Sequence, residues 1–136
     1  MPSRAAEKRR KQPVLTGQEW KLMERLWAKS PQPSYDLIEA LAPAEKWHPN
    51  TVRTMLARLV RKGAVTASPY KNLYLYSAAV GRDALVANES RSFLERVFGG
   101  ALQPALVHFV SQQRLTPEEV REMKRILDEN PGPDRP

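Results

Sequence analysis

The residues of this chain best suited to chemistry are cations in a stretch that contains no carboxylate. No Asp or Glu occurs between Lys46 and Arg82, although the 136-residue chain has 15 acidic residues in all. With Lys46 and Arg82 included, this stretch contains seven Lys and Arg residues. Their number equals the formal net charge of the whole chain, 22 − 15 = +7. A surface of one charge sign attracts a polyanion, because neutralising phosphates releases counterions. The stretch therefore predicts a surface that binds nucleic acid.

Residues 49–63 within this stretch predict a helix with one apolar face and one polar, cationic face. Pro49 suits a first helical position, since its missing N–H would be unpaired there, and Gly63 suits a C-terminal stop. The apolar side chains at helical spacing predict the core face. The opposite face carries the candidate DNA-binding residues Asn50, Thr51, Arg53, Thr54, Ala57, Arg58 and Arg61.

These side chains fit the groove of a DNA duplex in different ways. Arg53 could contact guanine with two hydrogen bonds, Asn50 could read adenine, and the short Thr54 and Ala57 would permit close approach to thymine methyls. We expect contacts to phosphates from Arg58, Arg61, Lys62, Lys71 and Asn72. Any one of these arginines could instead be a solvated surface charge.

The segments before this helix predict two further helices. Thr16–Glu19 forms a capping box that opens a helix to about Lys29, on which the tryptophans are expected to pack as core anchors. Ser34 is expected to cap the second helix, and Pro43 to end it.

The segment after Gly63 changes to the alternating period of a β-hairpin. Strands are expected at residues 65–68 and 73–77, around a turn at 69–72. Three helices followed by a hairpin is the order of a winged helix-turn-helix domain, whose third helix enters the major groove. We therefore predict a mainly α fold with a small β-hairpin, in which residues 14–80 form the DNA-binding domain.

Residues 81–129 predict three more helices with apolar stripes and no sheet to cover them. A homodimer through this helical domain would bury the stripes, whereas folding back on the winged domain is the alternative. The candidate dimerisation residues are Phe93, Leu94, Val97, Phe98, Leu102, Leu106, Phe109, Val110, Val120, Met123, Ile126 and Leu127.

Both ends of the chain have the composition of disordered segments. Residues 1–13 are expected to form a flexible basic arm, which could contact DNA or serve only as a solubilising leader. Residues 130–136, rich in proline, are expected to form a disordered tail.

Several function classes are not expected. The absence of cysteine excludes disulfides and cysteine-based metal sites. His48 and His108 are too far apart in sequence to suggest a metal site, and no catalytic motif occurs, so we expect no enzyme activity, no metal and no cofactor. No apolar run is long enough to cross a bilayer, so we expect a cytoplasmic protein without membrane insertion.

The helix opened by Pro49 and its surroundings resemble the penicillinase-repressor family, which includes the methicillin-resistance regulator. The resemblance lies in the run WHPNTVRTMLARLVRKG at residues 47–63, in Glu19-Trp20 and Leu26-Trp27 upstream, and in Ser92-Phe93-Leu94 downstream. It covers roughly residues 14–129.

The resemblance implies a dimeric winged-helix repressor that binds a palindromic operator of β-lactamase or related stress genes. It also implies release from DNA when a sensor protease cuts an Asn-Phe bond in the dimerisation domain. The matching bond is His108-Phe109, so a protease of different preference is implied. His48 stands where relatives carry a serine cap, and this change is expected to weaken the start of the third helix by about 1 kcal/mol unless another contact compensates.

The leading hypothesis is a homodimeric, sequence-specific transcriptional repressor whose partner is a double-stranded DNA operator. Two other classes stay open. The same basic face could bind an acidic protein, which would make the chain an adaptor, or it could bind DNA without sequence preference.

Overall fold

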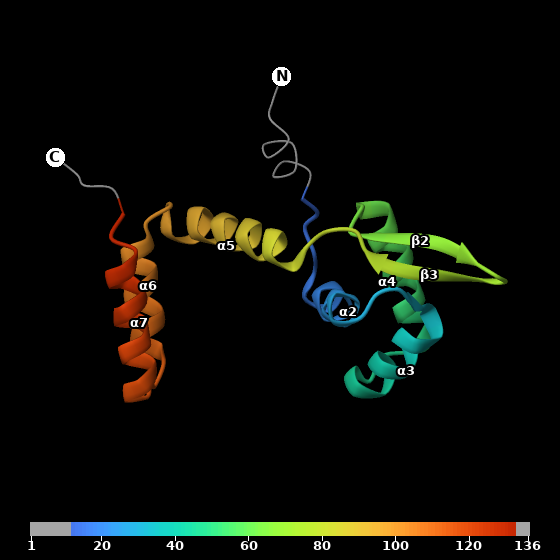
Figure 1. The fold of residues 1–136 in the computed structure, drawn as a ribbon, viewed down its shortest axis with the longest axis horizontal. Helices are drawn as coiled ribbons and strands as arrows, with labels where there is room; N and C mark the ends of the chain where they lie inside the picture. Colours follow the sequence, from blue (N-terminus) through green and yellow to red (C-terminus); the bar gives the residue numbers. More distant parts are fainter. Residues whose placement is uncertain (1–11, 133–136) are drawn as a thin grey trace, which may run out of the picture. The chain divides into compact units, whose positions relative to one another are not determined.

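The computed structural model describes residues 12–132 (Figure 1). Most of the predicted basic arm and residues 133–136 of the predicted tail lie outside the described residues. Six helices and three short strands make up the described part: α2 (Gly17–Ala28), β1 (Gln32–Pro33), α3 (Ser34–Glu45), α4 (Pro49–Lys62), β2 (Val65–Tyr70), β3 (Leu73–Ala78), α5 (Arg82–Phe98), α6 (Leu102–Gln112) and α7 (Pro117–Glu129). The predicted fold class is confirmed.

Helix α2 begins as its capping box predicts. The Glu19 N–H donates to Thr16 Oγ1 at 3.1 Å, and the Thr16 N–H donates to Glu19 Oε1 at 2.8 Å. Trp20 and Trp27 are half-buried and meet edge to face, with ring centroids 5.5 Å apart. The Trp27 indole also donates to the Val80 carbonyl at 2.8 Å, which joins α2 to the end of the sheet.

Helix α3 differs from the prediction at both ends. Ser34 is the first helical residue and not the cap, because Pro33 occupies the cap position without a side-chain hydrogen bond. Pro43 lies inside the helix, which continues to Glu45. A proline in the last turn removes a single intrahelical hydrogen bond, and the buried Leu37 and Leu41 hold the helix against the core.

The hairpin is longer than predicted, and its turn is tighter. Tyr70 pairs with Leu73, so Lys71 and Asn72 alone form the turn, and Lys71 adopts a positive φ of 56°. Pro69 fits within β2 because the sheet order β1-β3-β2 makes β2 an edge strand, which tolerates a missing N–H. The two-residue strand β1, which pairs with β3, was not predicted.

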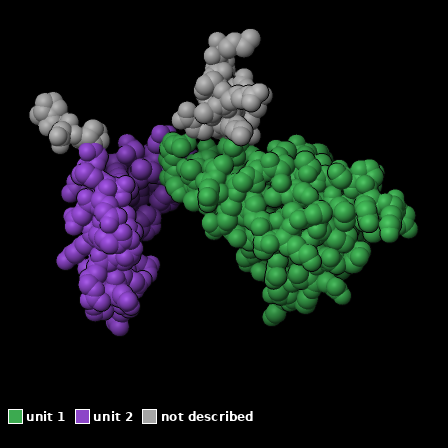
Figure 2. Space-filling view, viewed as in Figure 1, with its two compact units in different colours: residues 1–91 green, residues 92–136 purple. Residues whose placement is uncertain are grey.

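The chain divides between Arg91 and Ser92 into two compact units (Figure 2). The division lies beyond residue 80, where the sequence suggested a boundary. Leu85 is buried, and Arg82 Nε donates to Glu24 Oε1 at 2.9 Å, so the first turns of α5 belong to the first unit. The core of this unit consists of Leu22, Met23, Leu26, Leu37, Leu41, Val52, Met55, Leu56, Leu59, Ala64 and Val65.

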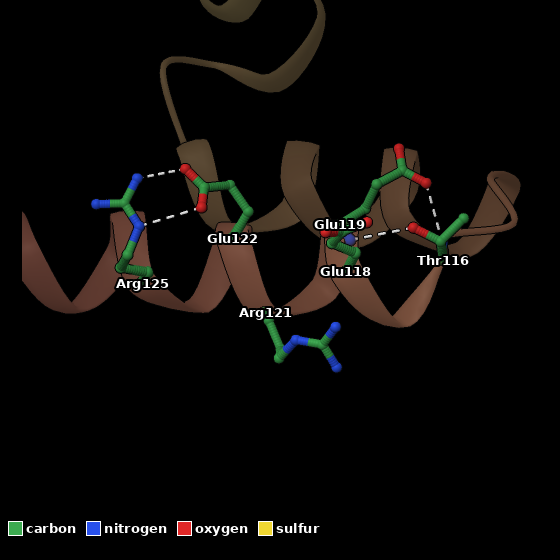
Figure 3. A pocket seen from close by; sticks show the side chains of 6 residues that line it. All are labelled: Thr116, Glu118, Glu119, Arg121, Glu122 and Arg125. Atoms are coloured by element: carbon green, nitrogen blue, oxygen red, sulfur yellow. Dashed lines mark hydrogen bonds and ion pairs between the residues drawn. The ribbon is translucent and has the colours of Figure 1, made fainter.

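The second unit contains the end of α5 together with α6 and α7. Helix α5 ends at Phe98 and is followed by Gly99 and Gly100, both of which have the positive φ that favours glycine after a helix. Helix α7 opens with the predicted capping box of Thr116 and Glu119 (Figure 3). Arg125 pairs with Glu122 on the same side of α7, so this face is polar and its charges are partly neutralised.

Candidate nucleic-acid interface

Helix α4 separates an apolar face from a polar face as predicted. Val52, Met55, Leu56 and Leu59 are buried. The predicted groove-facing residues point outward: Asn50, Arg53, Thr54, Ala57, Arg58 and Arg61 are exposed, and Thr51 is half-exposed. The described structure therefore brings these residues together on the exposed side of one helix, and none of them is acidic.

His48 itself caps α4, which compensates for the missing serine at the helix start. Its Nδ1 accepts the N–H of Asn50 at 3.0 Å, in the way a serine or asparagine oxygen would. Pro49 follows as the first helical residue. The imidazole thus satisfies one of the backbone donors that the first turn leaves unpaired.

The two predicted base-reading residues of α4 contact each other. Arg53 Nη1 donates to Asn50 Oδ1 at 3.0 Å. The bond orients the guanidinium along the exposed face and leaves the amide nitrogen of Asn50 free to donate to another group. The pair therefore presents donors from two side chains in one fixed arrangement.

Lys62, which is predicted to contact phosphate, has hydrogen-bond partners within the protein. Its ammonium donates to Glu19 Oε1 at 2.6 Å and to the Val14 carbonyl at 2.9 Å. Two acceptors within the protein thus hold the Lys62 ammonium, and its contact with phosphate stays a prediction. Sequence reasoning missed this pair because its residues lie in different helices and Glu19 reads only as a capping residue.

The neighbours of Glu19 favour its ionised form. Burial by itself raises the pKa of the Glu19 carboxyl, but hydrogen bonds from Lys62 and Thr16 and the charge of Lys62 lower it more, so its pKa lies below the ordinary value. Glu19 is thus held as a carboxylate although its side chain is fully buried.

A shallow hollow of about 280 Å³ lies between the start of α2 and the exposed side of α4. Gln18 of α2 lines it, a residue that sequence reasoning did not select because it lies outside the cationic stretch. The remaining lining residues are Asn50, Thr51, Thr54, Met55 and Arg58. No carboxylate lines the hollow, so its chemistry suits an anionic group.

The hairpin tip forms a second cationic position in the same unit. Lys71 and Asn72 are both exposed, as predicted, and the Lys71 ammonium lies 5.4 Å from the centroid of the Tyr70 ring. Tyr76 packs against the core, while Tyr74 is exposed. The tip therefore offers a cation and an amide on the turn that the wing of such a domain would present to a DNA backbone.

The second unit carries an apolar surface. Most of the predicted dimerisation residues are exposed: Val97, Leu102, Leu106, Phe109, Val110, Met123, Ile126 and Leu127. Phe93, Leu94, Phe98 and Val120 are half-buried. A groove of about 460 Å³ between α6 and α7 is lined almost entirely by apolar side chains, among them Val107 and Leu115, which the prediction omitted.

The His108-Phe109 bond lies inside α6. The His108 and Phe109 rings are 5.6 Å apart, and both belong to an aromatic cluster with Phe98. Phe93 completes the cluster, with its ring centroid 6.0 Å from that of Phe109. The predicted cleavage position is therefore part of a packed helix.

Other kinds of site find little support among residues 12–132. No group of three or more potential metal ligands occurs in this part of the chain. None of its helices is both long and apolar enough to cross a bilayer.

A model of one protein family, the penicillinase repressors, matches residues 15–129. The chain belongs to the penicillinase repressor family. The penicillinase repressor of Bacillus licheniformis is 29% identical over 121 residues, which cover 89% of this chain and 94% of that protein. The methicillin resistance regulatory protein MecI of Staphylococcus aureus is 25% identical over 114 residues, which cover 84% and 93%.

Solved structures of other proteins are also similar to this chain. The crystal structure of RV1404 from Mycobacterium tuberculosis has a TM-score of 0.50 and 18% identity, covers 90% of this chain and 78% of its own, and shows the fold alone. The DNA-binding domain of the repressor BlaI has a TM-score of 0.49 and 26% identity, and covers 53% of this chain and 88% of its own. Membership of the family makes the chain a transcriptional repressor by class, with a winged-helix DNA-binding domain.

Proposed function

We propose that this protein is a homodimeric repressor that binds a palindromic DNA operator in a sequence-specific manner. The observation that carries the proposal is the exposed, carboxylate-free side of α4, whose opposite side is seated in the core. A rigidly seated helix with such a face fits the major groove, where Arg and Asn side chains can read base edges. Lys71 and Asn72 at the hairpin tip would add contacts to the DNA backbone.

The homodimer is supported by the apolar surface of the second unit. Leu106 and Val110 of α6 and Ile126 and Leu127 of α7 are exposed around the apolar groove. A second copy of the chain would cover these side chains through a two-fold axis. Two copies of α4 would then meet half-sites one helical turn, or a small multiple of about 34–36 Å, apart.

The regulated genes and the release mechanism are proposed from the relatives. A penicillinase repressor and a methicillin resistance regulator suggest operators of β-lactamase or related genes. Release by a sensor protease would require a cut at His108-Phe109 in the cytoplasm. Because this bond lies within α6, the helix would have to unwind locally before a protease could bind it as an extended segment.

The test begins with selection of duplexes from a random library by the full chain. We expect an enriched sequence with two-fold symmetry, bound at least about 1,000-fold more tightly than random duplex. The logarithm of affinity should fall with the logarithm of salt concentration by about 0.9 for each phosphate neutralised.

Each alternative gives a different result in the same experiment. A non-specific DNA-binding protein would show an affinity ratio near one between selected and random duplexes. An adaptor for an acidic protein would enrich no duplex at all. Either outcome would contradict the proposed function.

A further inference from the structure

Glu19 is the one polar or charged side chain that is buried within residues 12–132, with 0% of its surface exposed. Its role in the capping box does not require this burial. Glu119 has the same role in the capping box of α7, where the Thr116 N–H donates to its Oε1 at 2.9 Å, and Glu119 is exposed. Burying a carboxylate is costly unless it is paired, so the burial of Glu19 calls for a different explanation.

The partner of Glu19 is at the far end of the helix that carries the proposed base-reading residues. Lys62 is the last residue of α4, and its ammonium lies 2.6 Å from Glu19 Oε1. The same ammonium donates to the Val14 carbonyl at 2.9 Å. Three segments are thus joined at one point: the residues before α2, the first turn of α2 and the end of α4.

This junction supplies a directional contact between α2 and α4, which apolar packing alone does not provide. The buried side of α4 consists of apolar residues, whose burial favours many closely related packing arrangements. A charge-assisted hydrogen bond has a preferred distance and direction. Reading of base edges needs side chains held to within about 0.5 Å, and such accuracy comes from supporting contacts behind the functional face.

We propose that the Glu19–Lys62 ion pair is a positioning device that fixes the end of α4 relative to α2, and that Lys62 acts on specificity without contacting DNA. The inference rests on the proposed DNA-binding function. It assigns to Lys62 a role different from that of the neighbouring Arg61, which is exposed on α4 and has no such partner among the described residues.

The test uses the full chain, the duplex selected by the wild-type protein and a random duplex of the same length. The variants are Lys62→Met, Glu19→Gln and, as the matched control, Arg61→Met. For each variant we would measure the affinity ratio between the two duplexes and the salt dependence of binding to the selected duplex. Circular dichroism would establish the temperature below which each variant is folded.

Lys62→Met and Glu19→Gln should each lower the affinity ratio by about tenfold, since residues of one hydrogen-bonded network are strongly coupled. Neither should lower the salt slope. Arg61→Met should do the opposite, lowering the slope by about 1.8 and leaving the ratio unchanged, because the proposed dimer loses one phosphate contact, worth about 0.9, in each half-site.

The inference would be overturned if Lys62→Met behaved like Arg61→Met. An unchanged ratio for Glu19→Gln would overturn it as well, even if Lys62→Met did not fold, because glutamine retains an oxygen acceptor for the Thr16 N–H and for the Lys62 ammonium and removes only the charge of the ion pair. A ratio near one for the wild-type protein would instead refute the proposed function, so the two failures are distinguishable.

Discussion

The two units bury their apolar side chains to very different extents. The first unit holds every buried apolar residue of the described chain except Ala105. The second unit has large apolar side chains exposed along α6 and α7, around a groove lined by both helices. Residues 12–91 thus enclose a core of their own, whereas the second unit does not bury the apolar side chains of α6 and α7 within itself.

Because of this difference, the two units suit different functions. A unit with a complete core can hold a rigid helix for base reading, and its stability should not depend on protein concentration. A unit with an open apolar face gains stability when a second copy covers that face, so its stability should rise with concentration. Substitutions of the same kind in each unit should therefore have different effects.

The largest effect is expected from a charge in the groove of the second unit. Val110→Glu would bury a carboxylate without a partner in the proposed dimer, which should weaken association by at least about 3–5 kcal/mol. Analytical ultracentrifugation would measure the dimer dissociation constant. Ser111→Glu adds the same charge at a neighbouring exposed position and should have little effect. Equal dissociation constants for the two variants would contradict the proposed interface.

A cavity in the core of the first unit should have a somewhat smaller effect, of a different kind. Leu59 is fully buried, and Leu59→Ala should lower the free energy of unfolding by about 2–5 kcal/mol at every protein concentration. Ile126→Ala in the second unit should destabilise the protein by an amount that depends on concentration. Urea denaturation at two concentrations, 100-fold apart, would distinguish the two behaviours. The same concentration dependence for both variants would contradict the claim that only the second unit is stabilised by association.

Changes on the exposed side of the first unit should affect DNA binding and leave folding intact. Arg53→Ala should lower discrimination against single-base changes in the operator by about 1–3 kcal/mol. Lys71→Ala should weaken binding to all duplexes alike, because a phosphate contact carries no sequence information. Fluorescence anisotropy with a set of single-base operator variants would measure both. Identical profiles for the two proteins would contradict the assignment of Arg53 to base reading.

A smaller effect is expected at the start of α4. His48→Ala removes the acceptor for the Asn50 N–H and should destabilise the first unit by about 1 kcal/mol. His48→Ser, which restores an acceptor, should recover most of the loss. Thermal unfolding would measure the series. A His48→Ala protein as stable as the wild type would show that the imidazole does not act as a cap.

The pH dependence of unfolding should report the ionisation of Glu19. Its pKa in the folded state lies below the ordinary value of 4.5, because Lys62 and Thr16 stabilise the carboxylate more than burial opposes it. The pair therefore contributes its full stability above the unfolded pKa, and the contribution is lost as pH falls through the folded pKa. Urea denaturation between about pH 6 and pH 3 should show a smaller loss for Glu19→Gln than for the wild type. Parallel curves would contradict this ionisation.

Local signals in the sequence predicted most of the fold. The two capping boxes, the proline and glycine that bound α4, and the change of period at Val65 each correspond to an observed helix end or strand. Pro43 misled the prediction because a proline is usually read as a stop, yet tertiary packing keeps α3 helical for another two residues. The strand β1 was missed because two residues carry no periodic pattern.

The sequence predicted the outward residues of the candidate interface but not their contacts with the rest of the protein. The helical wheel of α4 placed its outward residues correctly, since burial follows helical periodicity. It could not distinguish Lys62 from Arg61, because the carboxylate that pairs with Lys62 lies 43 residues away in sequence. The cap formed by His48 and the contribution of Gln18 likewise depend on side-chain geometry and tertiary contacts that a one-dimensional pattern does not contain.

The proposed homodimeric repressor can be tested most directly by the stoichiometry of the full chain on the selected duplex. Sedimentation of the free and bound protein, together with hydroxyl-radical footprinting, would measure it. We expect two chains of 15.5 kDa per duplex and a footprint with two-fold symmetry. A single chain that protects one asymmetric site would contradict it.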